Sequence, residues 1–322
     1  MLFYFSKENE METGEKWTIG EVIRKLRMEQ GISGQQLCRG LCSAPTFSRI
    51  EADEREAEIM MLEVILGRLG YPPDKFEIYA GKKEFILYDL RTKMRICQEK
   101  KKDHELEECI ELYQKMQEGI LSKLEEQFLF RMKGFLEWDR GNVKQGIDYI
   151  EQAITIIIPE GWKEKLNQYI LSSEELELLD ALAEMYIQQK WFDKAYILLH
   201  ELYLYLEQSY ERKLQKIKMY ARVSYQMALV LIKFQKIETA YITCKNTLEL
   251  LSKAGSLHQI PELWECMGNC IEIFAEKNFA LKEQGIACFQ RSYYLYLVKN
   301  QVEEAKKIKI HLEEEYQWEC IK

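Results

Sequence analysis

The chain has 322 residues, of which 47% are apolar and 30% are charged, a composition typical of globular proteins. It contains only 16 glycines and 5 prolines, and because strand-and-turn folds use those residues freely, their scarcity excludes an all-β fold and predicts long helices. The net charge of −8 argues against a protein that binds nucleic acid along its whole length, but it leaves room for a small DNA-reading module.

Membrane, disulfide and enzyme classes find little support in the sequence. No window approaches the roughly 18 uninterrupted apolar residues of a membrane span. The nine cysteines are irregularly placed, and two pairs, Cys38/Cys42 and Cys266/Cys270, have an i,i+4 spacing that can hold a metal. None of the four histidines lies close to either pair, so we predict reduced thiols, no metal site and a cytoplasmic protein. The chain also lacks a glycine-rich phosphate loop, an HExxH motif and a Cys–His–Asn spacing, which predicts no catalytic residues, no cofactor and no enzyme activity.

The first structured segment begins after a flexible tail predicted over residues 1–16. Thr18 is followed three residues later by Glu21, a capping box that predicts a helix from about Ile19. Gly31 provides the end of this helix, whose apolar residues lie on one stripe.

Three further short helices follow in quick succession. Ser33 and Gln36 form a second capping box, and Ser43 is the predicted N-cap of a third helix with Pro45 in its first turn. A fourth helix is predicted over about 57–69. Several short helices with a tight turn between the second and third are typical of a helix-turn-helix unit.

The segment 17–71 resembles the repressor-type (XRE-type) helix-turn-helix, in the version found in PlcR-like regulators of the Rap, Rgg, NprR, PlcR and PrgX (RRNPP) group of peptide sensors. The residues that carry the resemblance are Ile32-Ser33-Gly34-Gln35-Gln36-Leu37-Cys38, Leu41-Cys42-Ser43 and Phe47-Ser48-Arg49-Ile50-Glu51. The resemblance implies that Arg27, late in the first helix, pairs with Glu51 at the end of the third. Two positions depart from the family pattern: Gly34 replaces a glutamine that grips a phosphate, and Asp53 replaces a glycine, although aspartate tolerates the left-handed conformation.

The candidate DNA-binding residues lie on the second and third helices. They comprise Gln35, Gln36, Ser43, Ala44, Pro45, Thr46, Ser48 and Arg49. Arg49 is the only long hydrogen-bond donor on the exposed face of the third helix, and arginine to guanine is the commonest specific base contact. The alternative is a helix-turn-helix that serves only for packing or dimerisation.

A basic linker is predicted over 72–104, beginning at Pro72-Pro73, where the chain is broken. Between Lys82 and Lys102 there are eight basic and three acidic residues, and this excess can lie along DNA phosphates. A solvated linker helix is an equally good reading, and the two are compatible. Its inward residues would be Phe85, Leu87, Leu90, Met94 and Ile96.

The remaining segment, 105–322, is predicted to be helical and carries an internal repeat. In the first unit, small residues follow at the spacings of a tetratricopeptide repeat: Gly134, Gly141, Gly146 and Ala153. The first of these positions recurs at intervals of 49, 45 and 40 residues: Gly134, Ala183, Ala228 and Gly268. These intervals exceed the roughly 34 residues of the standard repeat, which predicts longer helices or connections. The fold class is therefore all-α, a helix-turn-helix domain followed by a tetratricopeptide superhelix.

A repeat array after the DNA-binding domain is also what the PlcR-like resemblance implies, and in that family the concave face binds a short secreted peptide. The first helix of each repeat lines such a face. The candidate peptide-binding residues are Arg131, Trp138, Glu184, Gln188, Arg222, Tyr225, Lys233, Glu265 and Asn269. Their mixture of charged, aromatic and amide groups suits a short peptide with a charged end.

These observations predict a peptide-responsive transcription regulator, a homodimer that binds a palindromic operator in double-stranded DNA. Two alternatives stay open. One is a tetratricopeptide adaptor that binds a protein partner and has no functional DNA readout. The other is a regulator whose array binds another protein in place of a peptide.

Overall fold

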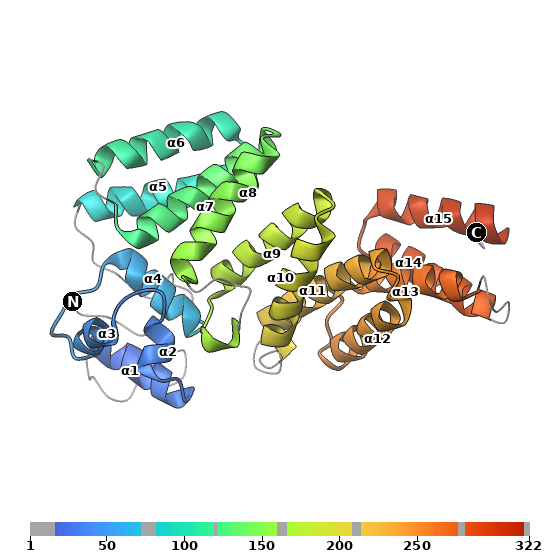
Figure 1. The fold of residues 1–322 in the computed structure, drawn as a ribbon, viewed down its shortest axis with the longest axis horizontal. Coiled ribbons are helices and arrows are strands. Elements are labelled where there is room, and N and C mark those ends of the chain that lie inside the picture. The colour runs from blue at the N-terminus through green and yellow to red at the C-terminus, as the bar shows by residue number, and fades with distance from the viewer. Residues whose placement is uncertain are drawn as a thin grey trace. The chain divides into compact units, whose positions relative to one another are not determined.

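The computed structural model describes residues 17–71, 82–118, 121–159, 166–207, 214–275 and 281–318. Every regular element in these ranges is helical, which confirms the all-α prediction. The predicted tail, 1–16, and Pro72-Pro73 lie outside the described residues. The chain divides into a compact first unit that ends at Leu182 and a second unit that begins at Ala183, coloured blue to green and yellow to red respectively in Figure 1.

The N-terminal segment forms the four predicted short helices: α1 (Ile19–Glu29), α2 (Gly34–Cys38), α3 (Ala44–Glu51) and α4 (Ile59–Arg68). Each of the first three begins at its predicted cap, because the side chains of Thr18, Ser33 and Ser43 accept the backbone N–H three residues later. The helices surround a common core that includes Ile23, Leu37, Phe47, Ile65 and Leu66.

The predicted linker contains a long helix, α5 (Lys82–Glu99), which forms a hairpin with α6 (Asp103–Met116) and also contacts α7. Leu87, Leu90 and Met94 are buried as predicted. Phe85 and Ile96 are exposed, so their predicted inward orientation is wrong. At 3.6 residues per turn these two side chains lie on the side of α5 opposite Met94 and Leu90, and the hairpin covers only one side.

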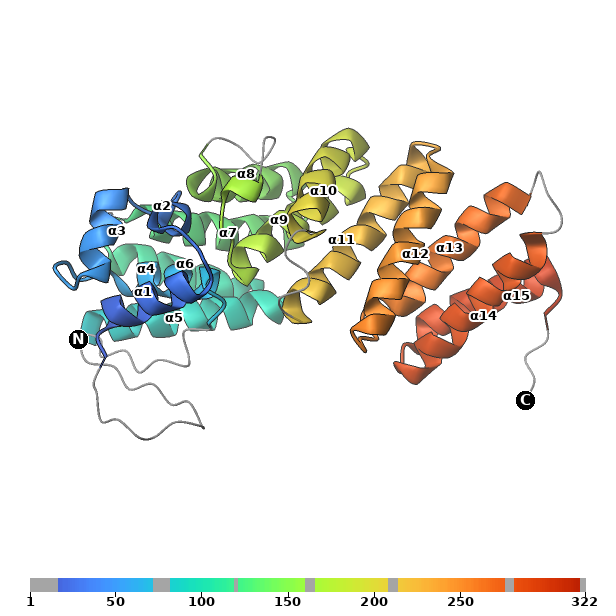
Figure 2. The ribbon, with the colours of Figure 1, turned by 90° about the horizontal axis from the view of Figure 1, so that it is seen from below.

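The rest of the first unit continues into the repeat array. Its helices are α7 (Lys123–Asp139), α8 (Val143–Ile157) and the beginning of α9 (Ser173–Gln188), within which the second unit starts. The second unit consists of the end of α9 followed by α10 (Phe192–Glu207), α11 (Leu214–Lys233), α12 (Ile237–Lys253), α13 (Ile260–Ala275), α14 (Lys282–Val298) and α15 (Val302–Tyr316). Consecutive helices from α10 to α15 contact one another, and Figure 2 shows α11 to α14 side by side.

The small residues of the predicted repeat lie where paired helices meet. A Cβ atom added to Gly146 of α8 would lie 3.0 Å from the Gly134 carbonyl oxygen of α7. In the fourth repeat, a Cβ atom on Gly268 would lie 2.7 Å from the Phe289 ring of α14. Ala183, Ala195, Ala228 and Ala240 are fully buried. Small side chains therefore permit close helix pairing, as the repeat pattern predicts.

Several helix ends use a left-handed residue that is not glycine. The residues with positive φ include Asp53 (56°), Lys101 (52°), Lys190 (60°), Gln235 (59°) and Asn300 (59°). Glycine normally occupies this position because it has no Cβ. The chain can therefore form many helical connections with few glycines. None of the helices that the structure describes is both long and apolar enough to cross a membrane.

Candidate functional site

The third helix, α3, presents the predicted recognition surface. Phe47 and Ile50 are buried in the core and fix the orientation of the helix. On the opposite side, Arg49 and its neighbours are exposed to solvent: Ala44, Pro45 and Ser48. Gln35 on α2 is also exposed. This surface is sterically available to a DNA groove, and its contact with bases stays a prediction.

Three of the other predicted DNA-binding side chains have structural partners. The hydroxyl groups of Ser43 and Thr46 are 2.9 Å apart, and Ser43 Oγ also accepts the Thr46 N–H at 3.3 Å. Gln36 Oε1 accepts hydrogen bonds from the Ser33 N–H at 3.0 Å and the Ser33 hydroxyl at 2.8 Å. Ser43 and Gln36 thus take part in helix caps. Because the Gln36 amide oxygen accepts these bonds, the amide nitrogen is the part of this side chain that could donate to a phosphate or a base.

The implied pair between the first and third helices is present. Arg27 Nε and Nη2 donate to the two Glu51 carboxylate oxygens at 2.7 and 3.0 Å, and Nη1 donates to the Ile32 carbonyl oxygen at 2.9 Å. The hydrogen bonds to Glu51 raise the pKa of Arg27. The pair ties α3 to α1 in a bidentate geometry that only arginine provides.

Asp53 follows α3 at the position where the related helix-turn-helix pattern has glycine. Its φ of 56° lies in the left-handed region, as the sequence suggested. Its carboxylate accepts the Gly20 N–H at 3.2 Å and the Thr18 hydroxyl at the start of α1. Asp53 therefore adopts the conformation that glycine would adopt here, and its carboxylate in addition caps the start of α1.

A buried arginine that the sequence analysis missed joins the helix-turn-helix to the start of α9. Arg68 Nε and Nη2 donate to the carboxylate of Glu175 at 3.2 and 2.8 Å. Arg68 Nη1 donates to the carbonyl oxygens of Leu37 and Arg39 at 2.8 and 2.7 Å. The Arg68 side chain is fully buried. The sequence signal that could have indicated this contact is the presence of an arginine at the end of the otherwise mostly apolar helix α4.

Nearby contacts extend this junction. The Arg39 guanidinium lies 4.8 Å from the centre of the Tyr169 ring, and Ile170 packs against the helix-turn-helix core. A Cβ atom on Gly40, whose φ is 78°, would lie only 2.1 Å from the Ile157 carbonyl oxygen at the end of α8. Only glycine fits between α2 and α3 at this point. The turn therefore lies between the Ile157 carbonyl group on one side and the Arg68 guanidinium, which binds the Leu37 and Arg39 carbonyl groups, on the other.

The basic residues of α5 have different surroundings. Arg91 is 3% exposed and lies 3.6 Å from Glu63, so the interpretation that it follows DNA phosphates is wrong for this residue. Burial raises the pKa of Glu63. The side chains of Lys83, Lys93 and Lys100 are exposed. For these lysines, two on α5 and one directly after it, contact with DNA phosphates stays a prediction.

The two candidate peptide-binding residues of the first unit lie on α7. Arg131 Nη1 donates to Glu174 Oε2 at 2.9 Å, and Glu174 also lies 3.5 Å from Arg95 of α5. Trp138 is half-buried. Arg131 is thus already paired with the Glu174 carboxylate of α9. A ligand that binds Arg131 must displace this carboxylate or share the guanidinium with it.

In the second unit, the structure brings two candidate residues together. Tyr225 of α11 lies near the carboxylates of Glu265 and Glu262 on α13, and its pKa is raised by burial and by these charges. Glu265 Oε2 accepts a hydrogen bond from Tyr296 at 3.0 Å, and burial raises the pKa of Glu265. Glu262 lies 3.7 Å from Lys299. Tyr225, Glu262, Glu265 and Tyr296 form a polar cluster, here called the α11–α13 cluster.

The remaining candidates are distributed along the same helices. Gln188 Nε2 donates to Glu184 Oε1 at 3.2 Å on the exposed side of α9. Arg222 Nη2 lies 3.7 Å from the Met219 sulfur, Lys233 is exposed and Asn269 is half-buried. Arg222 and Tyr225 share α11, while Glu265 and Asn269 share α13.

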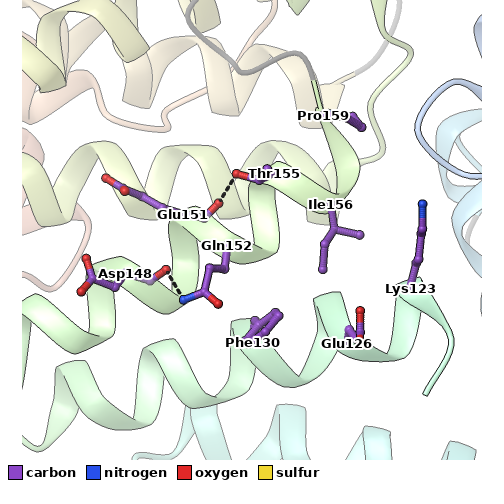
Figure 3. Close-up of a pocket in the computed structure, with 9 residues that line it drawn as sticks. All are labelled: Lys123, Glu126, Phe130, Asp148, Glu151, Gln152, Thr155, Ile156 and Pro159. Atoms are coloured by element: carbon purple, nitrogen blue, oxygen red, sulfur yellow. Dashed lines mark hydrogen bonds between the residues drawn. The ribbon is translucent and has the colours of Figure 1, made fainter. Parts of the chain in front are cut away.

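An open groove on the first repeat, shown in Figure 3, involves none of the predicted residues. It has a volume of about 730 Å³ and is lined by Lys123, Glu126, Phe130, Asp148, Glu151, Gln152, Thr155, Ile156 and Pro159. The lining combines three carboxylates with one lysine around the Phe130 ring. The sequence pattern did not indicate it, because these residues are not at the repeat positions assigned to the concave face; they lie on α7, on α8 and, for Pro159, just after α8.

Within the described ranges, no three histidine, cysteine or carboxylate side chains come together as a metal site. The described cysteines are all free thiols.

Comparison with known proteins identifies the architecture. No family model and no curated protein sequence matches the chain. The structure is similar to that of Bacillus thuringiensis PlcR, solved in complex with the peptide PapR7 and DNA, with a TM-score of 0.50 and 15% identity over 90% of this chain and 98% of that chain. Streptococcus dysgalactiae SHP pheromone receptor Rgg2 matches with a TM-score of 0.45 and 14% identity, covering 92% of this chain and 100% of that chain. The competence regulator ComR of Streptococcus vestibularis matches with a TM-score of 0.44 and 15% identity, covering 91% and 96%. The predicted resemblance to RRNPP-type regulators is confirmed at the level of the fold.

Proposed function

We propose that the chain is a DNA-binding regulator whose affinity for its operator is controlled by a short peptide bound by the repeat array. The observation that carries the proposal is the exposed α3 surface, held in place by the Arg27–Glu51 pair and followed by tetratricopeptide-like helix pairs. A fold shared with a regulator that was solved with both a peptide and DNA supports the same combination.

The division of labour that we propose follows the sequence. Residues 17–71 read DNA, 72–104 connect, and 105–322 bind the peptide, with the protein acting as a cytoplasmic homodimer on a palindromic site. A helix-turn-helix commonly binds paired half-sites, which a two-fold dimer matches. The first unit carries the DNA-reading helices together with α5 to α8, so the connecting segment is packed against its neighbours along α5.

The peptide-binding half of the proposal rests on the α11–α13 cluster. Tyr225 offers an aromatic surface, Glu265 a carboxylate with a raised pKa, and Asn269 an amide on the same helix. A carboxylate that burial makes costly to ionise is stabilised by a cationic ligand group. A peptide with an ammonium or guanidinium group therefore suits this cluster.

The DNA half can be tested without knowledge of the peptide. Selection from a random duplex library with the full chain should enrich a palindrome, and Arg49→Ala should weaken binding to it by about 1–3 kcal/mol. Arg24→Ala, which removes an exposed arginine from α1, is the matched control. Unchanged operator binding by Arg49→Ala would show that the recognition surface lies elsewhere.

The peptide half requires a ligand, which mass spectrometry can identify among small peptides retained from conditioned medium. Isothermal titration with that peptide, with and without operator DNA, should give two different affinities, since coupling between sites is reciprocal. Tyr225→Ala and Asn269→Ala should weaken peptide binding and leave peptide-free DNA binding nearly unchanged. Equal peptide affinities in the two titrations would contradict peptide control.

The open groove between α7 and α8 favours a second candidate function, a tetratricopeptide adaptor that binds a protein partner. Its acidic rim and apolar floor suit a basic amphipathic segment. This function predicts no salt-dependent binding to any duplex, whereas the regulator predicts a steep dependence on salt.

A further inference from the structure

The side of α5 that faces solvent carries two large apolar side chains. Phe85 is 63% exposed and Ile96 is 44% exposed. At 3.6 residues per turn, the two side chains point in the same direction to within about 20°. Leu87 and Met94 lie on the opposite side of the helix, in the core that α5 shares with α6 and α7. Apolar side chains gathered on an exposed surface are typical of an interaction site.

The same side of α5 carries a defined order of charges. Asp89 and Lys93 are exposed between the two apolar residues, and Lys100 follows directly after the helix at the same spacing. Residues three or four positions apart are neighbours on a helix, so these side chains form one strip. The strip is here called the α5 outer face: Phe85, Asp89, Lys93, Ile96 and Lys100.

The groove on α7 and α8 has the complementary character. In Figure 3, Ile156 of α8 points toward α7, where the Phe130 ring lies, so the floor of the groove is apolar. The charged groups of its lining are one lysine and three carboxylates: Lys123, Glu126, Asp148 and Glu151. The groove is therefore net acidic, whereas the α5 outer face carries two lysines and one aspartate.

Two donor groups of the lining are bonded within α8. Thr155 Oγ1 donates to the Glu151 carbonyl oxygen at 2.8 Å, and Gln152 Nε2 donates to the Asp148 carbonyl oxygen at 3.1 Å (Figure 3). The carboxylates and the Gln152 amide oxygen remain as acceptors. A surface that brings ammonium groups therefore fits this groove better than one that brings carboxylates.

We propose that the α5 outer face of one copy of the chain binds in the α7–α8 groove of a second copy, in a dimer in which both copies make this contact. Phe85 and Ile96 meet the apolar floor. The two lysines of the outer face pair with the groove carboxylates, and Asp89 pairs with Lys123. This interface rests on the homodimer of the proposed function and gives that dimer a surface.

A second copy is the occupant because one chain cannot bring the two surfaces together. The side of α5 that packs towards α7 holds Leu87 and Met94, so the outer face points away from α7. Each chain carries both surfaces, and a two-fold axis therefore forms the contact twice and leaves neither surface open. Lys93 and Lys100 then serve the dimer in place of DNA phosphates, and Lys83 stays available to DNA.

Charge reversal on each surface of the full chain tests the proposal, with the dimer measured by light scattering and analytical ultracentrifugation without DNA. The outer-face variant carries Lys93→Glu and Lys100→Glu, and the groove variant carries Glu126→Lys and Asp148→Lys. Each variant should raise the dimer Kd by about tenfold or more, because like charges then oppose each other. All four side chains are exposed, so both variants should keep the helical content and melting temperature of the unaltered chain.

An equimolar mixture of the two variants is the decisive measurement. The acidic outer face of one variant then meets the basic groove of the other, and the remaining pair of surfaces is unaltered, so the mixture should dimerise although neither variant does so alone. Lys83→Glu on α5 and Glu111→Lys on α6 change exposed charges outside both surfaces and should leave the dimer unchanged.

Three results would overturn the interface. Contact between two α5 helices would leave the groove variant dimeric, and contact between two grooves would leave the outer-face variant dimeric. A dimer that survives in both variants would mean that the interface lies elsewhere, and the proposed regulator would still stand. A monomeric unaltered chain would remove both the interface and the homodimer, while selection from random duplexes still tests DNA binding independently.

Discussion

The contact between Arg27 and Glu51 couples the recognition helix to α1 through two hydrogen bonds, with the two side chains 17% and 11% exposed. Removing either partner leaves the other partly buried and unpaired. We expect Arg27→Ala and Glu51→Ala each to lower the free energy of unfolding by about 1–3 kcal/mol. Urea unfolding of both single variants and the double variant measures the coupling between them.

Arg24→Ala is the control for this cycle, since it removes an exposed arginine from the same helix. It should change stability by no more than about 0.5 kcal/mol. If the losses of unfolding free energy in the two single variants simply add up in the double variant, the Arg27–Glu51 ion pair makes no net contribution to stability.

Glu265 gives a pH-dependent prediction. Because burial raises its folded-state pKa, the folded protein binds this proton more tightly than the unfolded chain, and stability is lost as pH rises from the unfolded pKa through the folded one. Glu265→Gln, which is neutral at every pH and keeps an acceptor for Tyr296, should therefore stabilise the protein at neutral pH. The stabilisation should vanish by about pH 4, below the usual glutamate pKa of about 4.3. Thermal melts at both pH values check the sign, and a destabilised variant at neutral pH would contradict it.

At the level of single residues, the sequence predicted those interactions that a motif encodes. The capping serines, the Arg27–Glu51 pair and the left-handed Asp53 all follow from local spacing or from the helix-turn-helix resemblance. The Arg68–Glu175 pair did not, because its partners are far apart in sequence and no local rule relates them. The α11–α13 cluster was partly predicted, since repeat register placed Tyr225 and Glu265 but not Tyr296.

At the level of helices, Gly146 and Gly285 occupy equivalent repeat positions, but their surroundings predict opposite effects of a Gly→Ala substitution on stability. A Cβ atom on Gly146 would lie 3.0 Å from backbone atoms of both Gly134 and Trp138, which cannot move independently. On Gly285 the nearest atom would be a side-chain methyl of Ile271, at an ordinary 3.4 Å. Alanine is a better helix former than glycine by about 1 kcal/mol.

We therefore expect Gly146→Ala to destabilise the protein and Gly285→Ala to leave it unchanged or stabilise it by up to about 1 kcal/mol. Differential scanning calorimetry of the two variants compares their melting temperatures, and because the substitution is the same in both, any difference comes from the site. Equal melting temperatures would mean that α7 and α8 separate easily, against the close approach seen here.

Helix pairing was predictable from small residues, but the extent of the helical structure was not. The repeat pattern predicted four pairs from α7 to α14. It did not separate α6 or α15, which carry no repeat glycine, and it treated α5 as a linker although Met94 and Leu90 bury one side of it against its neighbours. Periodicity shows that a helix has an apolar side; which of two opposite sides is covered depends on neighbours distant in sequence.

For the molecule as a whole, the start of α9 holds two adjacent carboxylates with different roles. Glu175 is buried against Arg68 of the helix-turn-helix, whereas the Glu174 side chain is 55% exposed. Glu175→Ala leaves a fully buried guanidinium without its carboxylate and should destabilise the first unit by about 3–5 kcal/mol. Glu174→Ala should cost no more than about 1 kcal/mol.

Hydrogen exchange of both variants shows where the loss falls. For Glu175→Ala we expect faster exchange in α2 and α4 together with the start of α9, since these segments share Arg68. Faster exchange confined to α9 would mean that the helix-turn-helix is stable without this junction.

The left-handed residues at the helix ends have an evolutionary consequence. Lys101, Lys190, Gln235 and Asn300 each adopt a conformation that costs a residue with a side chain about 1–2 kcal/mol. Replacement by glycine removes that strain at a smaller entropic cost of about 0.5–1 kcal/mol. Each position is thus a site where one substitution can compensate for a destabilising change elsewhere. A lineage carrying this chain can alter the α11–α13 cluster towards a new ligand and recover the lost stability at a connection that touches no ligand.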